Sequence, residues 1–274
     1  MSPLLIVRQG TTERWTLNDP ASRNALSAAM GAALFAACLR ARDDRELRVV
    51  VLIGSSGAFC AGGSLANFAS AIGQPLATGE NDPLIGLNRA YGDVLHALAN
   101  LPQLLVCAVD GAAMGGGLGL VCCADPVIAT ERSVFATPEV SIGLPPAQIT
   151  PLVWRRLGDR TAREWLLSGR HWRAVEAREA GLVQDLVADG ALEDALRDTL
   201  RRYSAAAPGA LAATKQLLSR LQAPLPDLRD EAAVAFAAAL RGNEAAHGLS
   251  AFARRQPPPW ADAPTGNGST GGSA

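Results

Sequence analysis

The spacing of hydrophobic and polar residues changes along this chain. Residues 4–7 and 14–17 alternate on either side of a glycine-containing turn, which predicts two paired strands. The runs 49–53 and 104–109 are apolar without interruption, which is typical of strands buried on both faces. Further strands are expected at 127–130 and 134–136, and helices at 28–42, 84–98, 118–124, 151–157, 161–168, 174–180, 190–205, 208–221 and 228–240. Strands and helices alternate early and helices dominate late, which indicates an α/β protein.

Each of the two buried strands runs into a turn of very small residues, at 54–63 and at 110–117. Glycine has no Cβ, so its backbone can approach a ligand closely and leave its N–H group bare. The glycines at 115–117 also stand where a helix is expected to begin, so their N–H groups lack helical partners. Two such turns can aim two N–H donors at one oxygen, as an oxyanion hole requires. A tight crossing of backbones is the structural alternative.

Other glycine-dependent functions fit less well. A dinucleotide fingerprint needs a last glycine where Leu120 stands, and no Gly-Lys-Ser/Thr sequence for a phosphate-binding loop exists. Residues 62–66 miss the nucleophile-elbow pattern by one position, and they follow Ile53 too late in the chain for a strained turn that leaves its strand directly. A hydrolase is therefore a weak hypothesis.

Glu139 is the most interesting carboxylate. Thr137 before it predicts a helix N-cap, Pro138 suits the first helical position, and an acid suits the first turn, so a capping role is one interpretation. Apolar neighbours on both sides favour another interpretation. Loss of water raises the pKa of a carboxyl group towards the range that is useful for proton transfer.

Composition narrows the class of protein. Hydrophobic residues make up 49% of the 274 residues and the formal net charge is −1, so a large core is expected and no nucleic-acid partner. The five cysteines lie in apolar stretches without metal-type spacing, and the three histidines are scattered, which predicts no metal site. Asp125 precedes a proline and suits a structural turn. With neither a secretory leader nor a membrane-length apolar run expected, the predicted location is cytoplasmic.

These residues resemble the enoyl-CoA hydratase/isomerase (crotonase) superfamily. The matching stretches are Asn-Ala-Leu at 24–26, Gly-Ala-Phe-Cys-Ala-Gly-Gly at 57–63, Val-Asp-Gly at 109–111, the glycines at 115–117, Pro-Glu at 138–139, Gly-Leu at 143–144, Ser-Gly at 168–169, the alanine-rich run at 174–183, and Ala-Phe with Arg and Pro at 251–257. They run in order over roughly residues 4 to 260. Residues 82–92, 117–120 and 144–149 look most like the isohexenylglutaconyl-CoA hydratase subgroup.

The resemblance implies a crotonase-like spiral of ββα units with a C-terminal helical trimerisation domain. The expected division is an acyl-CoA-binding core at 1–205, an oligomerisation domain at 206–262 and a disordered tail at 263–274. It implies a homotrimer or a hexamer, an acyl-CoA thioester as substrate and no further cofactor. Glu139 is the expected acid–base residue, and the N–H groups of Ala61 and Gly116 the oxyanion donors. The expected substrate and CoA contacts are Asn24, Ala25, Leu26, Gly62, Leu65, Gly115, Gly119, Phe252 and Arg255.

Two positions depart from the family pattern. Gly119 stands where hydratases with two glutamates carry the first acid, and Ser64 replaces the usual aspartate. Glycine at 119 is expected to leave room for a bulky acyl group, and Arg89 is a speculative partner for a substrate carboxylate, although a surface ion pair is the simpler role. Hydration of a branched, glutaconyl-type 2-enoyl-CoA is the main hypothesis. Double-bond isomerisation by Glu139 alone and a non-catalytic CoA-ester-binding or scaffold role are the alternatives.

Overall fold

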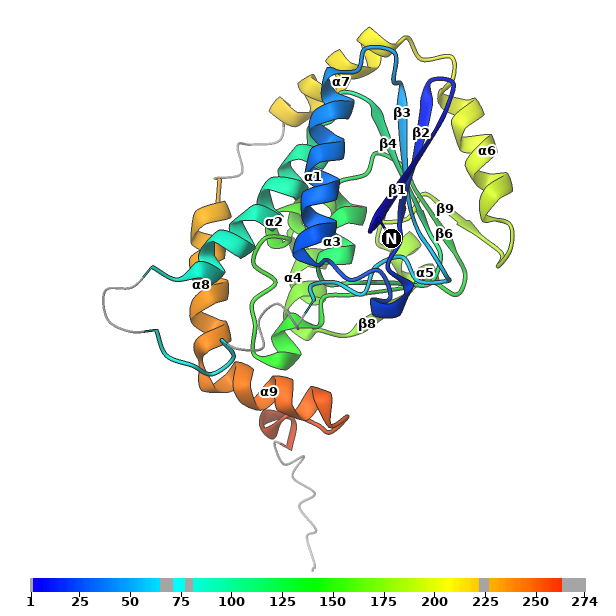
Figure 1. The fold of residues 1–274 in the computed structure, drawn as a ribbon. Coiled ribbons are helices and arrows are strands. Elements are labelled where there is room, and N and C mark those ends of the chain that lie inside the picture. Colours follow the sequence, from blue (N-terminus) through cyan, green and yellow to red (C-terminus); the bar gives the residue numbers. More distant parts are fainter. Residues whose placement is uncertain (1, 65–70, 77–80, 222–226, 263–274) are drawn as a thin grey trace, which may run out of the picture.

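A six-stranded sheet forms the centre of the protein (Figure 1). The computed structural model describes residues 2–64, 71–76, 81–221 and 227–262; the predicted tail at 263–274 lies outside them. The strand order is β1-β2-β3-β4-β6-β9, and all neighbours are parallel except β1 with β2. The strands are β1 (Leu4–Gln9), β2 (Thr12–Leu17), β3 (Val49–Gly54), β4 (Leu104–Val109), β6 (Val127–Thr130) and β9 (Asp185–Val187). A smaller sheet holds β5 (Ala112–Met114), β7 (Val134–Ala136) and β8 (His171–Arg173).

Helices cover both faces of the main sheet. One face packs its alternate side chains against α1 (Ala28–Asp43), α2 (Pro83–Ala99) and α3 (Gly116–Cys122). The other face packs against α6 (Leu192–Tyr203) and α7 (Pro208–Leu221). Residues of β3 and β4 thus contribute to two different hydrophobic clusters, which is why their sequences are apolar without alternation. The predicted α/β class is confirmed.

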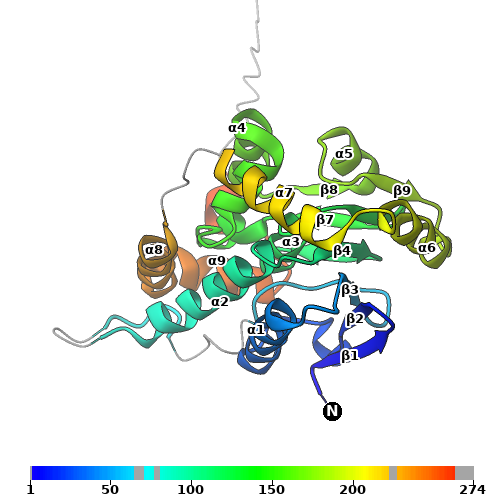
Figure 2. The same cartoon turned by 90° about the horizontal axis from the view of Figure 1, so that it is seen from above.

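The C-terminal helices α8 (Arg229–Arg241) and α9 (Asn243–Ala253) form a third hydrophobic cluster. Figure 1 and Figure 2 show α8 beside α2 and α9 following α8, both away from the main sheet. Phe236 and Leu240 of α8 pack with Leu84 of α2 and with Leu144, which lies in the segment after β7. The C-terminal helices therefore pack on the start of α2 and on the segment after β7.

Most of the expected elements are present, with a few differences. Ser27 caps α1 as predicted, because its Oγ accepts a hydrogen bond from the Met30 N–H at 3.1 Å. The two helices expected at 151–157 and 161–168 form α4 (Thr150–Ser168), which kinks at Gly158, where φ is +74°. The strands β5, β8 and β9 and the helices α5 (Ala174–Glu179) and α9 complete the fold. Each of those three strands has only three residues, too few for a period-two pattern to show.

The only lysine of the chain, Lys215, fastens α7 to the sheet. Its Nζ donates to the Gln103 carbonyl at 2.7 Å and to Asp125 Oδ2 at 2.6 Å. Asp125 Oδ2 also accepts from the Leu105 N–H at 2.8 Å, so the predicted turn role of Asp125 is confirmed. The Lys215 side chain is only 16% exposed.

Candidate active site

The two glycine turns meet in direct backbone contact. Cys60 pairs with Ala113 in a single parallel bridge, and the Met114 N–H donates to the Cys60 carbonyl at 2.9 Å. A Cβ on Gly62 would stand 2.7 Å from the Met114 carbonyl oxygen, and one on Gly117 would stand 2.6 Å from the Cys60 oxygen. Side chains at these positions would push the turns apart. The tight backbone crossing is therefore real, and it also brings both sets of amides to one place.

The Ala61 N–H, predicted to be one oxyanion donor, is already used inside the protein. It donates to the Arg23 carbonyl at 3.0 Å, so the prediction for Ala61 is wrong in this structure. The neighbouring residue whose N–H donates no recorded hydrogen bond to a described residue is Gly63. Leu26 and Gly63 form a single parallel bridge. The Leu26 N–H donates to the Gly62 carbonyl, and the Ser64 N–H donates to the Leu26 carbonyl. In such a bridge the N–H group of the central residue, Gly63, points away from Leu26.

Gly116 supplies the second amide. It is the first residue of α3, where an N–H group has no partner within the helix, and no hydrogen bond from it is recorded between described residues. Its position is tightly bounded, because a Cβ on Gly116 would lie 2.7 Å from Leu26 Cδ1 and 3.1 Å from Tyr91 Oη. The Gly63 and Gly116 amides thus come from turns that touch each other.

Glu139 lies directly on the second glycine turn. A Cβ on Gly115, whose φ is +50°, would stand 2.5 Å from Glu139 Oε1, so only glycine allows this approach. Glu139 Oε2 is buried and has no hydrogen-bond partner among the residues that the structure describes. Burial raises the pKa of the Glu139 carboxyl group to about 7. A carboxyl group with this pKa and an unpaired oxygen suits proton transfer near neutral pH.

The local fold at Glu139 differs from the predicted helix start. Residues Pro138–Ile142 form one turn of 3-10 helix that ends at Gly143 in the left-handed conformation. Thr137 does not cap it; its Oγ1 donates instead to the Trp165 carbonyl at 2.7 Å. The predicted capping role of Thr137 is therefore wrong, and the short helix serves to present Glu139 to the glycine turn.

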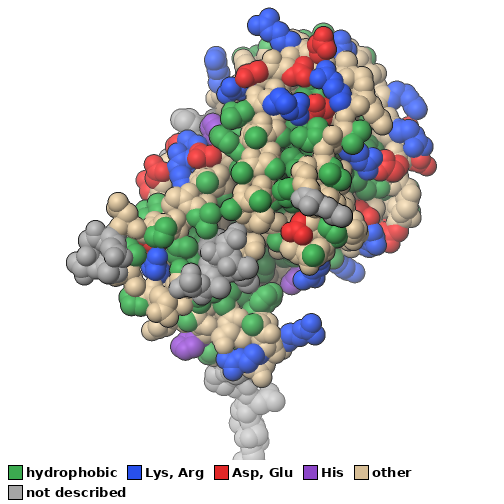
Figure 3. Space-filling view, viewed as in Figure 1, with side chains coloured by type: hydrophobic (Ala, Val, Ile, Leu, Met, Phe, Trp, Pro, Cys, Tyr) green, Lys and Arg blue, Asp and Glu red, His purple; other side chains and the backbone are tan. Residues whose placement is uncertain are grey.

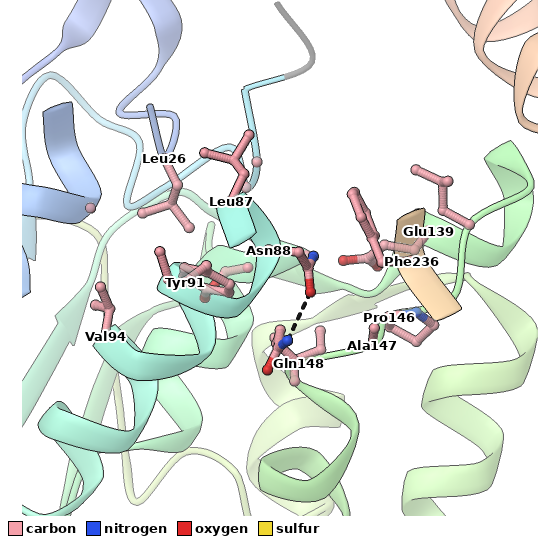
Figure 4. Close-up of a pocket in the computed structure, with 18 of the residues that line it drawn as sticks. Leu26, Leu87, Asn88, Tyr91, Val94, Glu139, Pro146, Ala147, Gln148 and Phe236 are labelled. Atoms are coloured by element: carbon pink, nitrogen blue, oxygen red, sulfur yellow. Dashed lines mark hydrogen bonds between the residues drawn. The ribbon is translucent and has the colours of Figure 1, made fainter. Parts of the chain in front are cut away.

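A cavity of about 500 Å³ opens in front of Glu139 and both turns (Figure 4). Its walls are mostly apolar and come from α1, α2, the two turns, the segment at 138–149, α8 and α9. Residues in its wall to which the sequence analysis assigned no role in the site include Phe35, Asn88, Tyr91, Ile142, Gln148 and Phe236. On the face seen in Figure 3, charged side chains crowd the upper and right-hand rim, while hydrophobic and uncharged surface occupies the middle.

Gly119 does not leave the space that was expected. A Cβ there would stand 2.5 Å from Ile149 Cγ2 and 3.0 Å from Tyr91 Oη, so both side chains fill the volume. Tyr91 Oη donates to the Gly116 carbonyl at 2.5 Å and lies in the cavity wall. The predicted room for a bulky acyl group beside Gly119 is thus wrong, and a tyrosine hydroxyl stands where a side chain at 119 would project.

The predicted substrate and CoA contacts lie in different places. Leu26, Gly62, Gly115 and Phe252 line the cavity. Asn24 does not: it is fully buried, its Nδ2 donates to the Ser55 and Ala58 carbonyls, and its Oδ1 accepts from the Asp19 N–H and Ser55 Oγ. Its side chain has no group left for a ligand, so the prediction for Asn24 is wrong. Ala25 and Arg255 lie outside the cavity wall, and Leu65 lies outside the described residues.

Arg89 has the simpler of its two predicted roles. It forms ion pairs with Asp93 and Asp230, the latter at 2.6 Å, and it is absent from the cavity wall. These pairs hold its guanidinium between α2 and α8. Arg89 is not the partner of a substrate group in this structure.

Two features are absent from the described part of the chain. It contains no group of three or more His, Cys, Asp or Glu side chains placed to hold a metal ion. Among the same residues, none of the helices combines the length and the apolar character needed to cross a membrane.

Comparison with known proteins agrees with this geometry. The sequence profile described as enoyl-CoA hydratase/isomerase matches residues 9–263. A 2,3-dehydroadipyl-CoA hydratase of Escherichia coli K12 is 34% identical over 94% of this chain and 98% of its own length. A solved enoyl-CoA hydratase/isomerase of Marinobacter aquaeolei is 38% identical, with a TM-score of 0.77 over 95% of this chain and 100% of its own. AtuE of Pseudomonas aeruginosa is 42% identical, with a TM-score of 0.76 over 94% and 99%.

Proposed function

The chain belongs to the enoyl-CoA hydratase/isomerase family, and we propose that it adds water to the double bond of a 2-enoyl-CoA thioester. One observation carries this proposal. The carboxyl group of Glu139, whose buried Oε2 has no hydrogen-bond partner among the described residues, lies on the glycine turn that also presents the Gly116 N–H to the cavity. A proton-transfer group and an anion-stabilising amide thus share one site.

In this proposal the thioester oxygen accepts hydrogen bonds from the N–H groups of Gly63 and Gly116. Addition of water at the β-carbon places negative charge on that oxygen in the transition state. Fixed amides stabilise this charge more strongly than they bind the uncharged carbonyl group, which is what accelerates the reaction. Losing one such donor typically costs about a hundredfold or more in rate.

Glu139 moves the proton. Its ionised form takes a proton from water as the oxygen attacks the β-carbon, and the resulting acid returns a proton to the α-carbon. The pKa of about 7 means that both forms are accessible near neutral pH, as a group with two successive roles requires. General acid–base catalysis of this kind contributes roughly 10²–10⁴-fold.

Tyr91 compensates for the acid that Gly119 lacks. Its hydroxyl stands 3.0 Å from where a Cβ on Gly119 would be, and it donates a hydrogen bond to the Gly116 carbonyl. Its oxygen lone pairs are then free to accept a hydrogen bond from the attacking water. Tyr91 also fixes the residue that carries the second oxyanion amide.

We extend the proposal to branched acyl groups, including those of the glutaconyl type. A mostly apolar cavity of about 500 Å³ supports a large acyl group, and the Escherichia coli relative that hydrates 2,3-dehydroadipyl-CoA supports one with a second carboxyl group. The extra bulk is accommodated between α2 and α8 rather than beside Gly119.

We also propose that Arg255 and Phe252 meet the CoA moiety, and that the protein is a homotrimer or a hexamer. Phe252 is 60% exposed although it lines the cavity. Arg255 is exposed just beyond α9. Such a location suits contact with the polar part of a CoA ester or with a neighbouring subunit. Light scattering should give three or six times the mass of one chain.

The test is an absorbance assay with two sets of esters. A hydratase removes the conjugated thioester absorbance of 2-enoyl-CoA esters, and the product is a 3-hydroxyacyl-CoA by mass spectrometry. An isomerase instead creates that absorbance from 3-enoyl-CoA esters, a reaction for which Glu139 alone suffices. A non-catalytic member binds both sets of esters and changes neither. Unchanged absorbance of every 2-enoyl ester, with binding demonstrated, would exclude the proposed hydration.

A further inference from the structure

We infer that Asn88 is a specificity residue that receives an oxygen atom of the acyl group through its side-chain amide N–H. The inference rests on the proposed function, and it names a substrate class: acyl groups that bear a hydrogen-bond-accepting oxygen beyond the double bond. Asn88 lines the otherwise mostly apolar cavity from α2.

Gln148 fixes which end of the Asn88 amide faces the cavity. Its Nε2 donates to Asn88 Oδ1 at 2.8 Å and to the Arg229 carbonyl at 3.0 Å (Figure 4). A backbone carbonyl can only accept, so the Arg229 contact identifies the Gln148 nitrogen. Because that nitrogen donates, the Asn88 atom facing it must be the oxygen. The Asn88 Nδ2, with its two N–H groups, is left on the other side.

Gln148 itself has little freedom to turn. It is 8% exposed, and its Oε1 packs against α2 at Gly92, where a Cβ would stand 2.3 Å from that oxygen. Any residue larger than glycine at position 92 would displace Gln148. A buried glutamine, a helical glycine and a backbone carbonyl therefore hold the Asn88 amide in one orientation.

The Asn88 Nδ2 has no hydrogen-bond partner recorded among the described residues, and Figure 4 shows it on the side towards Phe236 and Glu139. A donor in an apolar wall is favoured only when an acceptor meets it, since an unmet donor loses its hydrogen bonds to water. Asn88 lies one helical turn before Tyr91, about 4.5 Å along the axis. The acceptor thus belongs to the acyl group, beyond the carbon that water attacks.

No free positive charge accompanies this donor in the part of the chain that the structure describes. Arg89 and Arg229 are the cations nearest along α2 and α8, and both form ion pairs with Asp93. The shared chemistry of the expected ligands is therefore an acceptor oxygen, as in a carbonyl, a hydroxyl or a carboxylate group. The experiment distinguishes the neutral oxygens from the carboxylate.

The experiment compares 2-enoyl-CoA esters of one chain length that carry a methylene, a keto oxygen or a terminal carboxylate, with the oxygen moved along the chain one carbon at a time. The wild type is expected to prefer one oxygen-bearing ester in kcat/KM. In Asn88→Leu the ratio of that value to the value for the methylene ester should fall roughly three- to tenfold. Gln148→Leu should lower the same ratio less, because Asn88 stays but can turn.

Asn100→Leu is the matched control, because Asn100 is an exposed residue at the far end of α2, where its Nδ2 donates to the His96 carbonyl. It should leave the ratio unchanged. An unchanged ratio in Asn88→Leu would overturn the inference. If the ratio stays the same because all esters lose activity equally, Asn88 contacts the CoA moiety instead. If the wild type turns over no ester, the proposed function fails. The ratio of the dissociation constants of the same two esters then still tests the role of Asn88.

Discussion

Two glutamates of this protein that have buried carboxyl oxygens lie in opposite environments. Glu13 of β2 accepts from both Arg40 guanidinium nitrogens, at 2.8 and 2.6 Å, and from Trp15 Nε1 at 2.8 Å. These hydrogen bonds, above all those from Arg40, lower the pKa of Glu13. Glu139 has no partner for Oε2, and burial raises its pKa to about 7. Burial alone therefore does not mark a functional acid; burial without partners does.

The same contrast explains what each residue does for the fold. Glu13 makes its full set of contacts within the protein, so its charge stabilises the folded state. Glu139 is held by the shape of the glycine turn rather than by donors, so its charge is costly until a substrate or water meets it. The following five changes test this contrast, from the largest expected effect to the smallest.

Glu139→Gln should abolish most of the turnover. The amide keeps the shape of the side chain but cannot take a proton from water, so we expect a loss of roughly 10²–10⁴-fold in kcat. The dissociation constant of a CoA ester, measured by calorimetry, should change little. Normal turnover in this variant would remove Glu139 from the reaction.

Gly115→Ala should cost about a hundredfold in kcat/KM, the size typical of a lost oxyanion donor. Its Cβ would collide with Glu139 Oε1 and displace both the carboxyl group and the Gly116 amide. Gly190→Ala is the control, because Gly190 also has a positive φ, +88°, but nothing lies within 4 Å of its Cβ position. If both variants lose activity equally, backbone strain and not the collision is responsible.

The stability of the protein should depend on pH through Glu139. Its pKa in the folded protein, about 7, lies above the ordinary value of 4.5, so the unfolded chain releases this proton first. The contribution of the protonated carboxyl group is complete below about pH 4.5 and is lost as the pH rises towards about 7, in total roughly 3 kcal/mol. Denaturant titrations should show this decline in wild type and not in Glu139→Gln. An identical pH dependence in both proteins would contradict it.

Glu13→Gln should lower the free energy of unfolding by about 2 kcal/mol, because it leaves the Arg40 and Trp15 donors with a weaker acceptor. Urea titration measures this, and activity should be affected only through the loss of folded protein. Glu46→Gln is the control: Glu46 is 88% exposed and 3.6 Å from Arg8, so its effect should stay below about 0.5 kcal/mol. Equal effects of the two changes would show that the Glu13 contacts contribute little.

Tyr91→Phe should lower kcat for hydration about tenfold, the value of one hydrogen bond to the attacking water. Exchange of the α-hydrogen of a saturated acyl-CoA in deuterated water depends on Glu139 and not on that water, so it should fall less. Tyr203→Phe, on the other face of the sheet, is the matched control. A parallel loss of hydration and exchange would assign Tyr91 to the positioning of Gly116 alone.

The sequence predicted the fold class, the long elements and the place of Glu139, because each depends on residues that are close along the chain. The runs at 49–53 and 104–109 became β3 and β4, and Ser27 caps α1. What local pattern could not show is which amide is already occupied. The Ala61 N–H is engaged by Arg23, and the choice between Ala61 and Gly63 depends on that distant carbonyl.

The missed residues of the cavity share one cause. Asn88, Tyr91, Gln148 and Phe236 come from α2, from the loop before α4 and from α8. The subgroup resemblance covers the first three, but it assigned none of them a role. Helical spacing on α2 places Asn88 and Tyr91 on one face, but it does not say which face meets the glycine turns. Asn24 shows the converse, since the side chain of this motif residue braces the first glycine turn instead of contacting a ligand.

The ion pair of Lys215 has a practical consequence. The chain has a single ε-amino group, and that group is 16% exposed and held by Asp125 and the Gln103 carbonyl. Amine-directed acylating reagents should therefore modify the native protein mainly at its amino terminus. Acylation of Lys215 requires α7 to detach from the sheet. The fraction of molecules with one added acyl group on α7 therefore measures how many have lost this contact.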